Sequence, residues 1–308
     1  MSSVQSNPDR VAVIVLNWNR RDDTLRCLDS LASVTTPPLD VFMVDNGSSD
    51  GTEQSVRSRF PGVHVIQNGA NLGFAEGNNV AIRLAIAEGF RWIMLLNNDT
   101  TVAPDAIEKL LQPLRNDHSI AVCSGAIVYM RTPDIVWSAG GQIDRPTGRV
   151  STDWLNHPLA ALPGSPYVVD HVSGCAMMVR ADAIVKAGLL DPRFFMYYEE
   201  TEWCARIVAS GYRIVVNPQA IIRHDIDPTA QAASPLIAYY MTRNHLLFLR
   251  ATRAPVQAWA YTVFWQARTL ASLFLRPSDS SRTRGRVPML RAMRDFTLGR
   301  FGQFQSAK

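Results

Sequence analysis

Short apolar runs alternate with amphipathic segments along the first hundred residues, and this rhythm constrains the fold more than any other feature. Four runs have the length and composition of buried strands: residues 11–16, 41–44, 63–66 and 92–96. Residues 22–33 and 77–89 carry apolar side chains at helical spacing, and residues 48–50 are suited to begin a further helix. Strands alternating with helices predict an α/β fold, a mostly parallel sheet flanked by helices on both faces.

A polar cluster follows each of the four predicted strands. The clusters are rich in Asn, Asp, Gly and Ser and occupy residues 17–19, 45–49, 68–73 and 97–99. One such cluster alone is typical of a turn, because these residue types dominate turns. The carboxyl ends of parallel strands, however, meet at one edge of the sheet, where ligands of α/β proteins bind. Four clusters at one edge therefore predict a binding face.

The second half of the chain has a different pattern, which predicts an α+β extension of the sheet without an internal repeat. We expect further strands at 167–171, 176–180, 213–216 and 220–223, and helices at 181–187 and 201–210. The first domain is expected to cover residues 1–235, and a helical, basic extension to cover 236–308. A Pro/Ser/Arg-rich break at 276–286 interrupts the extension.

Composition and charge exclude several classes of protein. Residues 276–308 hold eight Lys/Arg against two Asp/Glu, so the net charge of +4 leaves residues 1–275 slightly acidic. A nucleic-acid-binding protein is not expected to concentrate its positive charge in this way. Four dispersed cysteines without a C-x-x-C pair argue against a zinc ribbon or a disulfide framework. They are typical of a protein in a reducing cytoplasm.

Two nucleotide-binding motifs are missing, since the sequence contains neither G-x-G-x-x-G nor a Walker sequence. A dinucleotide-dependent oxidoreductase and a P-loop enzyme are therefore excluded. Residues 1–10 are polar, and the apolar run after them is too short for a signal peptide. The apolar stretch 255–275 contains Gln257, Gln266 and Arg268, which predicts a buried or interfacial helix rather than a membrane span.

Six segments in a fixed order resemble the family 2 glycosyltransferases: VIVLNWNR, VDNGSSDGT, NLGFAEGNN, LLNNDT, YYEETEW and IIRH. The resemblance covers roughly residues 11–250 and is greatest to the bacterial rhamnosyltransferase-like branch. It implies the GT-A nucleotide-sugar-binding fold, with a Rossmann-like sheet. The nucleotide-binding half would be about 11–120 and the acceptor half about 121–235, followed by the helical C-terminal extension.

The resemblance implies a nucleotide site at the ends of the first three strands. Asp45 matches an aspartate that accepts a hydrogen bond from the N3–H of uracil or thymine, a donor that cytosine lacks. Its alternative role is to shape an Asx-turn or to cap a helix. Asn17 and Asn19 would line the base and ribose pocket. Asn71 and Gly73 match a loop that closes over the nucleotide.

The NND sequence stands where the family has its D-x-D motif, which holds Mg²⁺ or Mn²⁺ against the diphosphate. Asp99 fits this metal-binding role because a carboxylate is a hard oxygen ligand. Asn97 replaces the first aspartate without its charge, and both Asn97 and Asn98 are expected to contact the nucleotide. His224 matches a histidine that completes the cation site in metal-dependent relatives. A structural or exposed histidine is the alternative.

The paired acids of YYEETEW match the acid–base centre of the family. Glu200 would be the general base that takes the acceptor hydroxyl proton as the oxygen attacks the anomeric carbon, so the reaction would invert configuration. Most relatives have aspartate there, so the glutamate changes the reach by one methylene. Glu199 would position the loop or bind acceptor. The alternative is a solvated acidic helix start favoured by the helix dipole.

Three further residues are expected near the acceptor or the transferred sugar. Gly174, in a segment that resembles the one beneath the sugar, would permit close approach of the backbone. Glu202 would face acceptor or solvent. Trp203 and Trp154 could stack on an acceptor sugar, although aromatic residues of the core are commoner.

The donor and acceptor stay open at this point. The leading expectation is a pyrimidine nucleotide sugar, with dTDP-L-rhamnose as the first candidate, and transfer to a hydroxyl of a glycan or lipid-linked acceptor. A UDP-hexose or UDP-galactofuranose donor is the alternative. From a different class, the chain could be a non-catalytic nucleotide-sugar-binding subunit. Nucleic acid is not an expected partner.

Arginines alternate with apolar residues between 282 and 300, a pattern typical of a segment that lies on anionic lipid. Such contact would place the protein peripherally on the inner face of the cell membrane, where cell-wall or polysaccharide assembly uses lipid-linked acceptors. A helix packed on the catalytic domain, or a homodimer contact, fits the same pattern.

Overall fold

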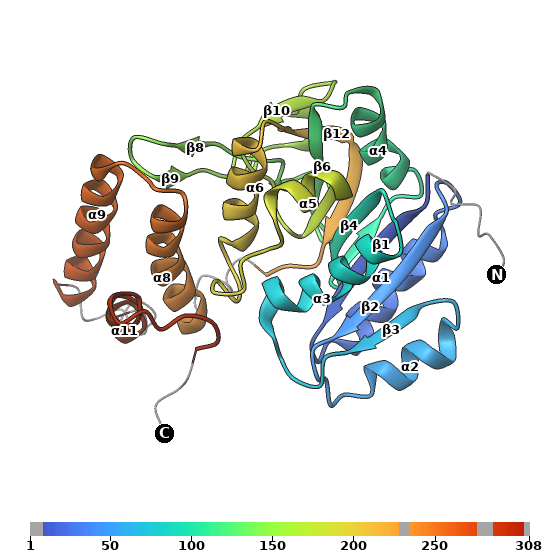
Figure 1. Cartoon of the computed structure of the whole chain (residues 1–308), viewed down its shortest axis with the longest axis horizontal. Coiled ribbons are helices and arrows are strands. Elements are labelled where there is room, and N and C mark those ends of the chain that lie inside the picture. Colours follow the sequence, from blue (N-terminus) through green and yellow to red (C-terminus); the bar gives the residue numbers. More distant parts are fainter. Residues whose placement is uncertain (1–8, 228–233, 276–285, 305–308) are drawn as a thin grey trace.

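An α/β domain and a group of three helices stand side by side in the computed structural model, which describes residues 9–227, 234–275 and 286–304 (Figure 1). The strands of the large sheet are β1 (Val11–Asn17), β2 (Leu39–Asp45), β3 (His64–Gln67), β4 (Trp92–Asn97), β5 (Thr100–Val102), β6 (Ile120–Tyr129), β7 (Val136–Ser138), β10 (Tyr167–Val169), β11 (Ala176–Arg180) and β12 (Arg213–His224). The helices of this domain are α1 (Arg21–Ala32), α2 (Thr52–Arg59), α3 (Gly73–Ala87), α4 (Ala106–Asn116), α5 (Ala181–Ala187) and α6 (Glu199–Ala209).

The sheet runs β10-β12-β6-β11-β4-β1-β2-β3, with β5 beside β12 and β7 beside β6. Its first four strands in the chain are parallel, as the alternating pattern predicts, and the two strands β11 and β10 run antiparallel to their neighbours. Asn17 therefore lies opposite Asp45, and Asn97 lies opposite Leu16. The polar ends of the strands share one edge, as predicted.

Alternation along β1 shows how the sheet is covered on both faces. Ala12 and Ile14 face a core shared with α3, α5 and α6, whereas Val11, Val13 and Val15 face a second core shared with α1, α2 and α4. Because side chains alternate across a strand, a continuous apolar run can serve both cores at once.

Several boundaries differ from the predicted ones, and strand β6 and helix α4 were not predicted. The predicted strands 213–216 and 220–223 are one strand, β12. Its register shifts between Asn217 and Ile221, so the interruption between the two apolar runs in the sequence corresponds to a bulge in the strand. Helix α3 begins at Gly73, four residues before the predicted start, and Gly73 and Ala75 of its first turn are buried.

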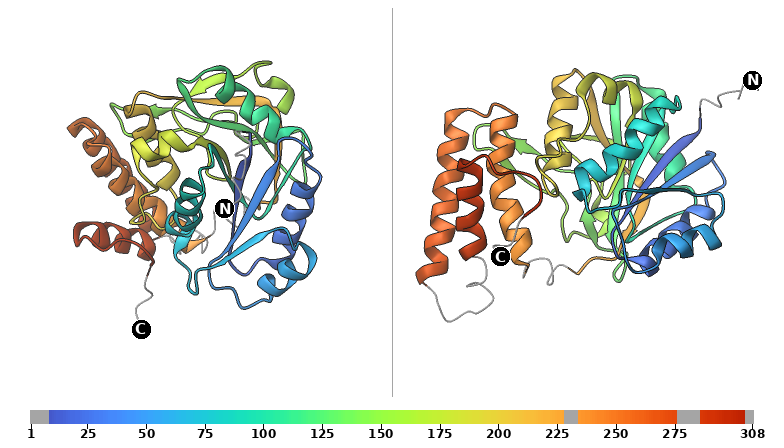
Figure 2. Two further views of the ribbon diagram at one scale, coloured as in Figure 1. Left: turned by 45° about the vertical axis from the view of Figure 1, so that its right-hand side comes forward. Right: turned by 60° about the horizontal axis from the view of Figure 1, so that its bottom comes forward.

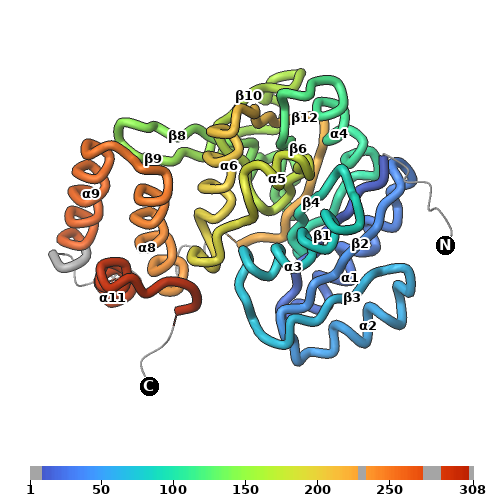
Figure 3. Tube along the Cα trace, viewed as in Figure 1, coloured from blue at the N-terminus to red at the C-terminus, as the bar shows by residue number. Residues whose placement is uncertain are grey.

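The C-terminal extension contains α8 (Pro235–Ala251), α9 (Val256–Leu275) and α11 (Arg286–Thr297). The three helices lie beside one another next to the α/β domain (Figure 2), and α11 packs on α8. A hairpin of β8 (Ile143–Asp144) and β9 (Arg149–Val150) reaches toward α8 and α9 (Figure 3), where His245 Nε2 bonds the Gly148 carbonyl at 2.8 Å. The predicted break at 276–286 falls almost wholly outside the described residues.

No helix in the described ranges combines the length and the apolarity that crossing a bilayer requires.

Candidate active site

The ends of β1 and β2 form a buried polar cluster around Asp45. Asn17 Nδ2 donates to Asp45 Oδ1 at 3.3 Å and to Ser48 Oγ at 3.0 Å. Asp45 Oδ1 also accepts from the backbone N–H of Ser48, and Asp45 Oδ2 accepts from Gln67 Nε2 at 2.7 Å. Asn17 and Asp45 are each 1% exposed. The remaining acceptor capacity of the carboxylate lies on Oδ2, which is the atom available to a base N–H.

The other expected nucleotide residues join the same cluster. Asn98 Nδ2 donates to Asn17 Oδ1 at 3.0 Å and to Thr24 Oγ1 at 2.9 Å. Asn19 has a left-handed backbone (φ 52°), and its Oδ1 accepts from the Ser49 N–H at 2.8 Å. The amide of Asn17 is thus hydrogen-bonded at both its oxygen and its nitrogen within the protein. It joins α1, β2 and the end of β4 into one edge.

The glycine loop before α3 is shaped by Asn71 and Gly73. Asn71 Oδ1 accepts from the Gly73 N–H at 2.9 Å, and Gly73 has a φ of +77°. A Cβ at Gly73 would lie 2.5 Å from the carbonyl oxygen of Phe195, so only glycine fits. That carbonyl accepts from the Phe74 N–H at 2.6 Å and lies 3.3 Å from the Ala75 nitrogen, at the start of α3.

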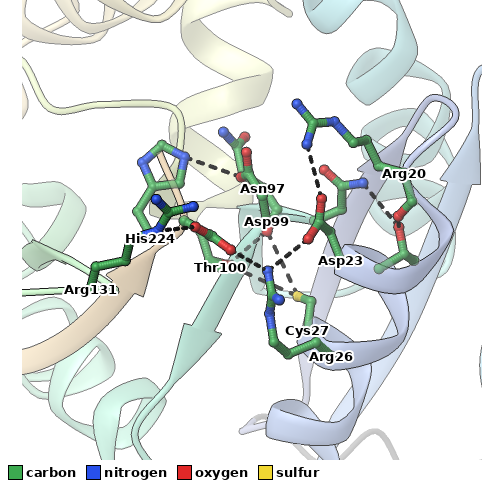
Figure 4. Close-up of polar contacts among 12 residues, drawn as sticks. Arg20, Asp23, Arg26, Cys27, Asn97, Asp99, Thr100, Arg131 and His224 are labelled. Atoms are coloured by element: carbon green, nitrogen blue, oxygen red, sulfur yellow. Dashed lines mark hydrogen bonds and ion pairs between the residues drawn. The ribbon is translucent and has the colours of Figure 1, made fainter. Parts of the chain in front are cut away.

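Asp99 and His224 lie together, as the resemblance implies, because β12 pairs with β5 and sets His224 opposite Thr100. We call these two residues the cation pair (Figure 4). His224 Nε2 is 3.1 Å from Asp99 Oδ1, yet neither Asp99 Oδ1 nor His224 Nδ1 has an aligned hydrogen bond to a described residue. Burial opposes protonation of His224, but Cys175 and Asp99 raise its pKa to about 10. Without a bound cation, the surroundings therefore favour the protonated form of His224. A divalent cation bound there would have to replace that proton.

The cation pair fits two ligands of a divalent ion. Adjacent ligands of an octahedral ion with bonds of about 2.1 Å lie about 3 Å apart, close to the separation seen here. No group of three His, Cys, Asp or Glu suited to a metal occurs in the described part of the chain. The other ligands would have to come from substrate oxygens and water. Asn97 is fixed through its backbone, since its N–H bonds the Cys175 carbonyl at 2.8 Å.

Four charged residues near the cation pair were not singled out by sequence reasoning. Arg26 Nη2 bonds Asp23 Oδ1 at 2.7 Å and Asp225 Oδ2 at 2.9 Å, and Arg131 lies 3.8 Å from Asp225 (Figure 4). Asp225 could have been noticed because it directly follows His224. The link between Arg26 and Asp225 spans 199 positions, so no local pattern could have shown it.

Glu199 and Glu200 begin α6, and Oε2 of each is buried without a hydrogen-bond partner among the described residues. Burial and the charge of Glu200 raise the pKa of Glu199 well above its usual range. Burial also raises the pKa of Glu200, and this rise is opposed by backbone amides that include those of Thr201 and Gly174. A proton acceptor in such surroundings is poised to take a proton at moderate pH.

One segment connects the cation pair to the glutamates. The Cys175 thiol is within hydrogen-bonding reach of His224, and a Cβ on Gly174 would lie 3.5 Å from the Cβ of Glu200. The Tyr197 phenol lies near both the cation pair and the two glutamates. Burial and the charges of Glu199, Glu200 and Asp99 raise its pKa to about 12. The predicted metal residues and the predicted base therefore occupy one site.

Two expected acceptor residues lie elsewhere. Glu202 is 3% exposed and forms two hydrogen bonds to Arg206, at 2.6 and 2.8 Å, so it faces neither acceptor nor solvent. Trp203 is fully buried and its Nε1 donates to the Gly188 carbonyl at 2.7 Å. Both expectations were wrong because the rotation of α6 about its own axis buries these two side chains. Trp154 is half-buried against the same core.

The sequence model of the glycosyl transferase family 2 matches residues 12–184, which include the strand ends and the aspartate of the cation pair. The chain belongs to glycosyl transferase family 2. It is a glycosyltransferase, and the resemblance stated from its motifs is confirmed.

Two curated relatives place this glycosyltransferase near the rhamnosyltransferases. It is 27% identical over 280 residues to N-acetylglucosaminyl-diphospho-decaprenol L-rhamnosyltransferase of Mycobacterium tuberculosis, covering 81% of this chain and 88% of the relative. It is 24% identical over 225 residues to dTDP-rhamnosyl transferase RfbF of Shigella flexneri, covering 70% of this chain and 72% of the relative.

The fold is also confirmed by solved structures. Mannosyltransferase PcManGT from Pyrobaculum calidifontis, solved in complex with GDP-Man and Mn²⁺, superposes with a TM-score of 0.60 at 17% identity. The match covers 94% of this chain and 88% of that one. The glycosyltransferase therefore has the predicted GT-A fold, with a helical C-terminal region.

Proposed function

We propose that this glycosyltransferase inverts configuration at the anomeric carbon and depends on a divalent cation. The observation that carries the proposal is a group of buried polar atoms: Glu199 and Glu200 each bury a carboxylate oxygen without a hydrogen-bond partner among the described residues, and Asp99 Oδ1 is buried 3.1 Å from His224 Nε2 without an aligned hydrogen bond. Buried polar atoms without partners are rare in folded proteins, and each calls for a ligand or a chemical role. Two carboxylates at one end of the site and a cation pair at the other match the needs of glycosyl transfer.

Glu200 is the general base in this proposal. Its Oε2 would accept the proton of the acceptor hydroxyl while that oxygen attacks the anomeric carbon from the face opposite the leaving diphosphate. Asp99 and His224 would hold Mg²⁺ or Mn²⁺, which neutralises the charge of the departing diphosphate when bound. Glu199 lies beside Glu200 and raises the cost of ionising the pair, and the backbone amide of Gly174 lies close to the base.

A pyrimidine nucleotide is the proposed carrier of the sugar. Asp45 Oδ2 accepts one hydrogen bond, from Gln67, and has capacity for another from the N3–H of uracil or thymine. Asn19, Asn71, Gly73 and Asn97 surround this edge and would contact the nucleotide. Asn17 and Asn98 would act mainly by holding Asp45 and the strand ends in place.

The proposed donor is dTDP-L-rhamnose, since both curated relatives named above transfer rhamnose. A UDP-hexose or UDP-galactofuranose is the alternative, because Asp45 does not distinguish uracil from thymine at N3. The acceptor would be a glycan or an N-acetylglucosaminyl lipid diphosphate, as in the mycobacterial relative.

A donor panel tests the proposal directly. Purified full-length protein is incubated with dTDP-L-rhamnose, UDP-galactofuranose, UDP-glucose or GDP-mannose, together with Mn²⁺, Mg²⁺ or EDTA. Release of nucleoside diphosphate is measured with and without a polyprenyl-diphosphate N-acetylglucosamine acceptor. We expect cation-dependent release that is fastest with dTDP-L-rhamnose, and a product of inverted anomeric configuration by NMR. Full activity in EDTA, preference for GDP-mannose or retention of configuration would each contradict part of the proposal.

We also propose that the extension contacts anionic lipid, through α9 more than through the basic tail. Helix α11 packs on α8, and its residues Met289 and Ala292 are buried, so that part of its apolar side is already covered. Helix α9 instead exposes Val256, Val263 and Phe264, by 82%, 53% and 61%. Residues 236–308 hold twelve Lys/Arg against two Asp/Glu. Like charge disfavours pairing of two extensions, whereas an anionic bilayer complements them.

Vesicle flotation separates lipid contact from a homodimer. The wild-type protein should float with vesicles of phosphatidylglycerol and phosphatidylcholine, and much less with phosphatidylcholine alone. Replacing Val263 and Phe264 by Ser should abolish flotation while leaving release of nucleoside diphosphate unchanged. Soluble behaviour on anionic vesicles, or a dimer that dissociates on the same replacement, would overturn the lipid proposal.

A further inference from the structure

The loop of residues 193–198, which leads into the glutamates, has an unusual backbone. Phe195, Tyr197 and Tyr198 all have left-handed conformations, with φ values of 67°, 67° and 72°. Side chains with a Cβ rarely adopt this conformation, and they keep it only where neighbouring contacts hold them. Tyr198 is the N-cap residue of α6, directly before Glu199, so its conformation sets the direction of the first turn, which carries Glu200.

Asn244, on α8 of the C-terminal extension, supplies contacts of this kind. Its Nδ2 lies 2.9 Å from the carbonyl oxygen of Phe194, 2.8 Å from that of Met196 and 2.8 Å from that of Tyr197. The side chain is completely buried. The amide nitrogen carries two hydrogens, which the three carbonyl oxygens share, and neither an aspartate nor an apolar residue offers such donors.

The neighbouring Arg243 fixes the orientation of that amide. Its Nε donates to Asn244 Oδ1 at 2.9 Å, which turns the amide nitrogen toward the loop. Its Nη2 donates to the Phe194 carbonyl at 2.9 Å, and its Nη1 to the Gly302 carbonyl at 2.7 Å. This guanidinium is also completely buried. Burying a charged guanidinium or an amide costs free energy unless the group is hydrogen-bonded. The carbonyl oxygens of the loop supply part of the hydrogen bonding of these two side chains.

The opposite side of the same loop rests on the donor half of the site. The Phe195 carbonyl accepts from the first amides of α3, the helix that begins at Gly73 of the nucleotide loop. A methyl group at Gly73 would collide with that carbonyl. The loop is therefore held between α3 on one side and Asn244 on the other, with Glu200 at its end.

We propose that Asn244 and Arg243 are positioning residues for the general base, acting through the backbone of residues 193–198. This inference rests on the proposed role of Glu200. The extension then has a function in the reaction besides any contact with lipid. The carbonyl groups to which Asn244 and Arg243 donate belong to the loop that sets the direction of the first turn of α6. Neither residue touches the reacting atoms.

The test compares Asn244→Leu and Arg243→Lys with Met289→Ala, in the full-length protein. Asn244→Leu removes the donor to the loop, and Arg243→Lys keeps a buried cation but loses the bond that orients Asn244. Met289 is buried in α11, so its truncation weakens the extension without removing a bond to the loop. We expect kcat to fall about 100-fold in Asn244→Leu and less in Arg243→Lys, with the donor KM changed less than about threefold. Met289→Ala should keep its kcat at temperatures where it is folded.

A double mutant with Glu200→Gln decides whether Asn244 acts through the base. If it does, Asn244→Leu slows the wild-type enzyme but causes no further loss in the Glu200→Gln background. Multiplicative losses, or an unchanged kcat in both Asn244→Leu and Arg243→Lys, would overturn the inference while the role of Glu200 stands. Undiminished turnover in Glu200→Gln alone would instead remove the proposed base, and the inference with it. If Asn244→Leu does not fold, Arg243→Lys takes its place in the same cycle.

Discussion

The two ends of the site differ in how their polar groups are satisfied. At the nucleotide end, the amide of Asn17 and both oxygens of Asp45 bond other protein groups. At the reaction end, carboxylate oxygens of Asp99, Glu199 and Glu200 are buried without a hydrogen-bond partner in the described chain. Both ends are equally polar in the sequence. The first has most of its hydrogen bonds within the protein, and the second leaves buried carboxylate oxygens without them.

This difference separates residues that hold the site from residues that act in it. A bonded buried group stabilises the fold, and its removal leaves its partners unsatisfied. An unbonded buried carboxylate destabilises the fold and is tolerated where function needs it. Replacements at the nucleotide end should therefore lower stability, whereas replacements at the reaction end should lower activity and leave the fold intact or firmer.

Glu200→Gln should have the largest effect on turnover. Loss of a general base lowers kcat by about 10²–10⁴-fold, while the neutral amide keeps the shape of the site and donor binding. Steady-state release of nucleoside diphosphate and calorimetric titration of donor measure the two quantities. Because burial raises the pKa of Glu200, the charged form costs stability at neutral pH, and the variant should melt no lower than wild type.

Glu202→Gln is the matched control for that prediction. Glu202 lies on the same turn of α6 but pairs with Arg206. Its replacement should cost about 1–3 kcal/mol of unfolding free energy and leave kcat nearly unchanged. A large loss of kcat in Glu202→Gln with normal stability would contradict the separation of roles.

His224→Ala should weaken the cation site. The apparent affinity for Mn²⁺ in the presence of nucleoside diphosphate should fall at least about tenfold, or 1.4 kcal/mol, because one of the two protein ligands is lost. Titration of activity with Mn²⁺ and the rise in melting temperature on adding Mn²⁺ with diphosphate both report it. His171→Ala is the control, since His171 is buried against the Ser151 carbonyl and should affect only stability. Equal Mn²⁺ dependence in both variants would argue against the cation pair.

Asn17→Ala should affect stability more than chemistry. Removing the amide leaves Asp45, Thr24 and Asn98 with lost partners, at a cost of about 1–3 kcal/mol. Urea unfolding measures this cost, and turnover per folded molecule should fall far less than in Glu200→Gln. A loss of turnover as large as that of Glu200→Gln, with normal stability, would show that Asn17 acts on substrate directly.

The sequence was sufficient to predict the parallel strands, the shared edge and the contact between Asp99 and His224. These features follow from local apolar runs and from motifs whose order is preserved. It could not predict that Glu202 and Trp203 are buried, because the rotation of α6 depends on the loop before it. The bonds of Asn244 to that loop span 47 to 50 positions, and the link between Arg26 and Asp225 spans 199. No periodicity extends across such distances.

Glu199→Gln should have a small effect on turnover and the clearest dependence on pH. Burial and the charge of Glu200 raise the pKa of Glu199 in the folded protein, so the folded state holds its proton more tightly than the unfolded chain. The folded state therefore loses stability as pH rises above about 4.3, the ordinary pKa of a glutamate side chain. Glutamine removes this loss, and the variant should melt higher than wild type at pH 8 but not at pH 4.

The Glu199→Gln replacement also tests whether Glu199 affects the titration of Glu200, the proposed base. Glu199 holds its proton more tightly than Glu200 and is neutral while Glu200 titrates, so glutamine at position 199 should leave the acidic limb of the kcat/KM profile nearly where it is. Melting curves and initial rates between pH 4.5 and 9 measure both effects on one protein. A melting advantage that grows toward acid pH would mean that Glu199 is stabilised as a charge. In that case the reaction end would resemble the nucleotide end, and the contrast between them would fail at Glu199.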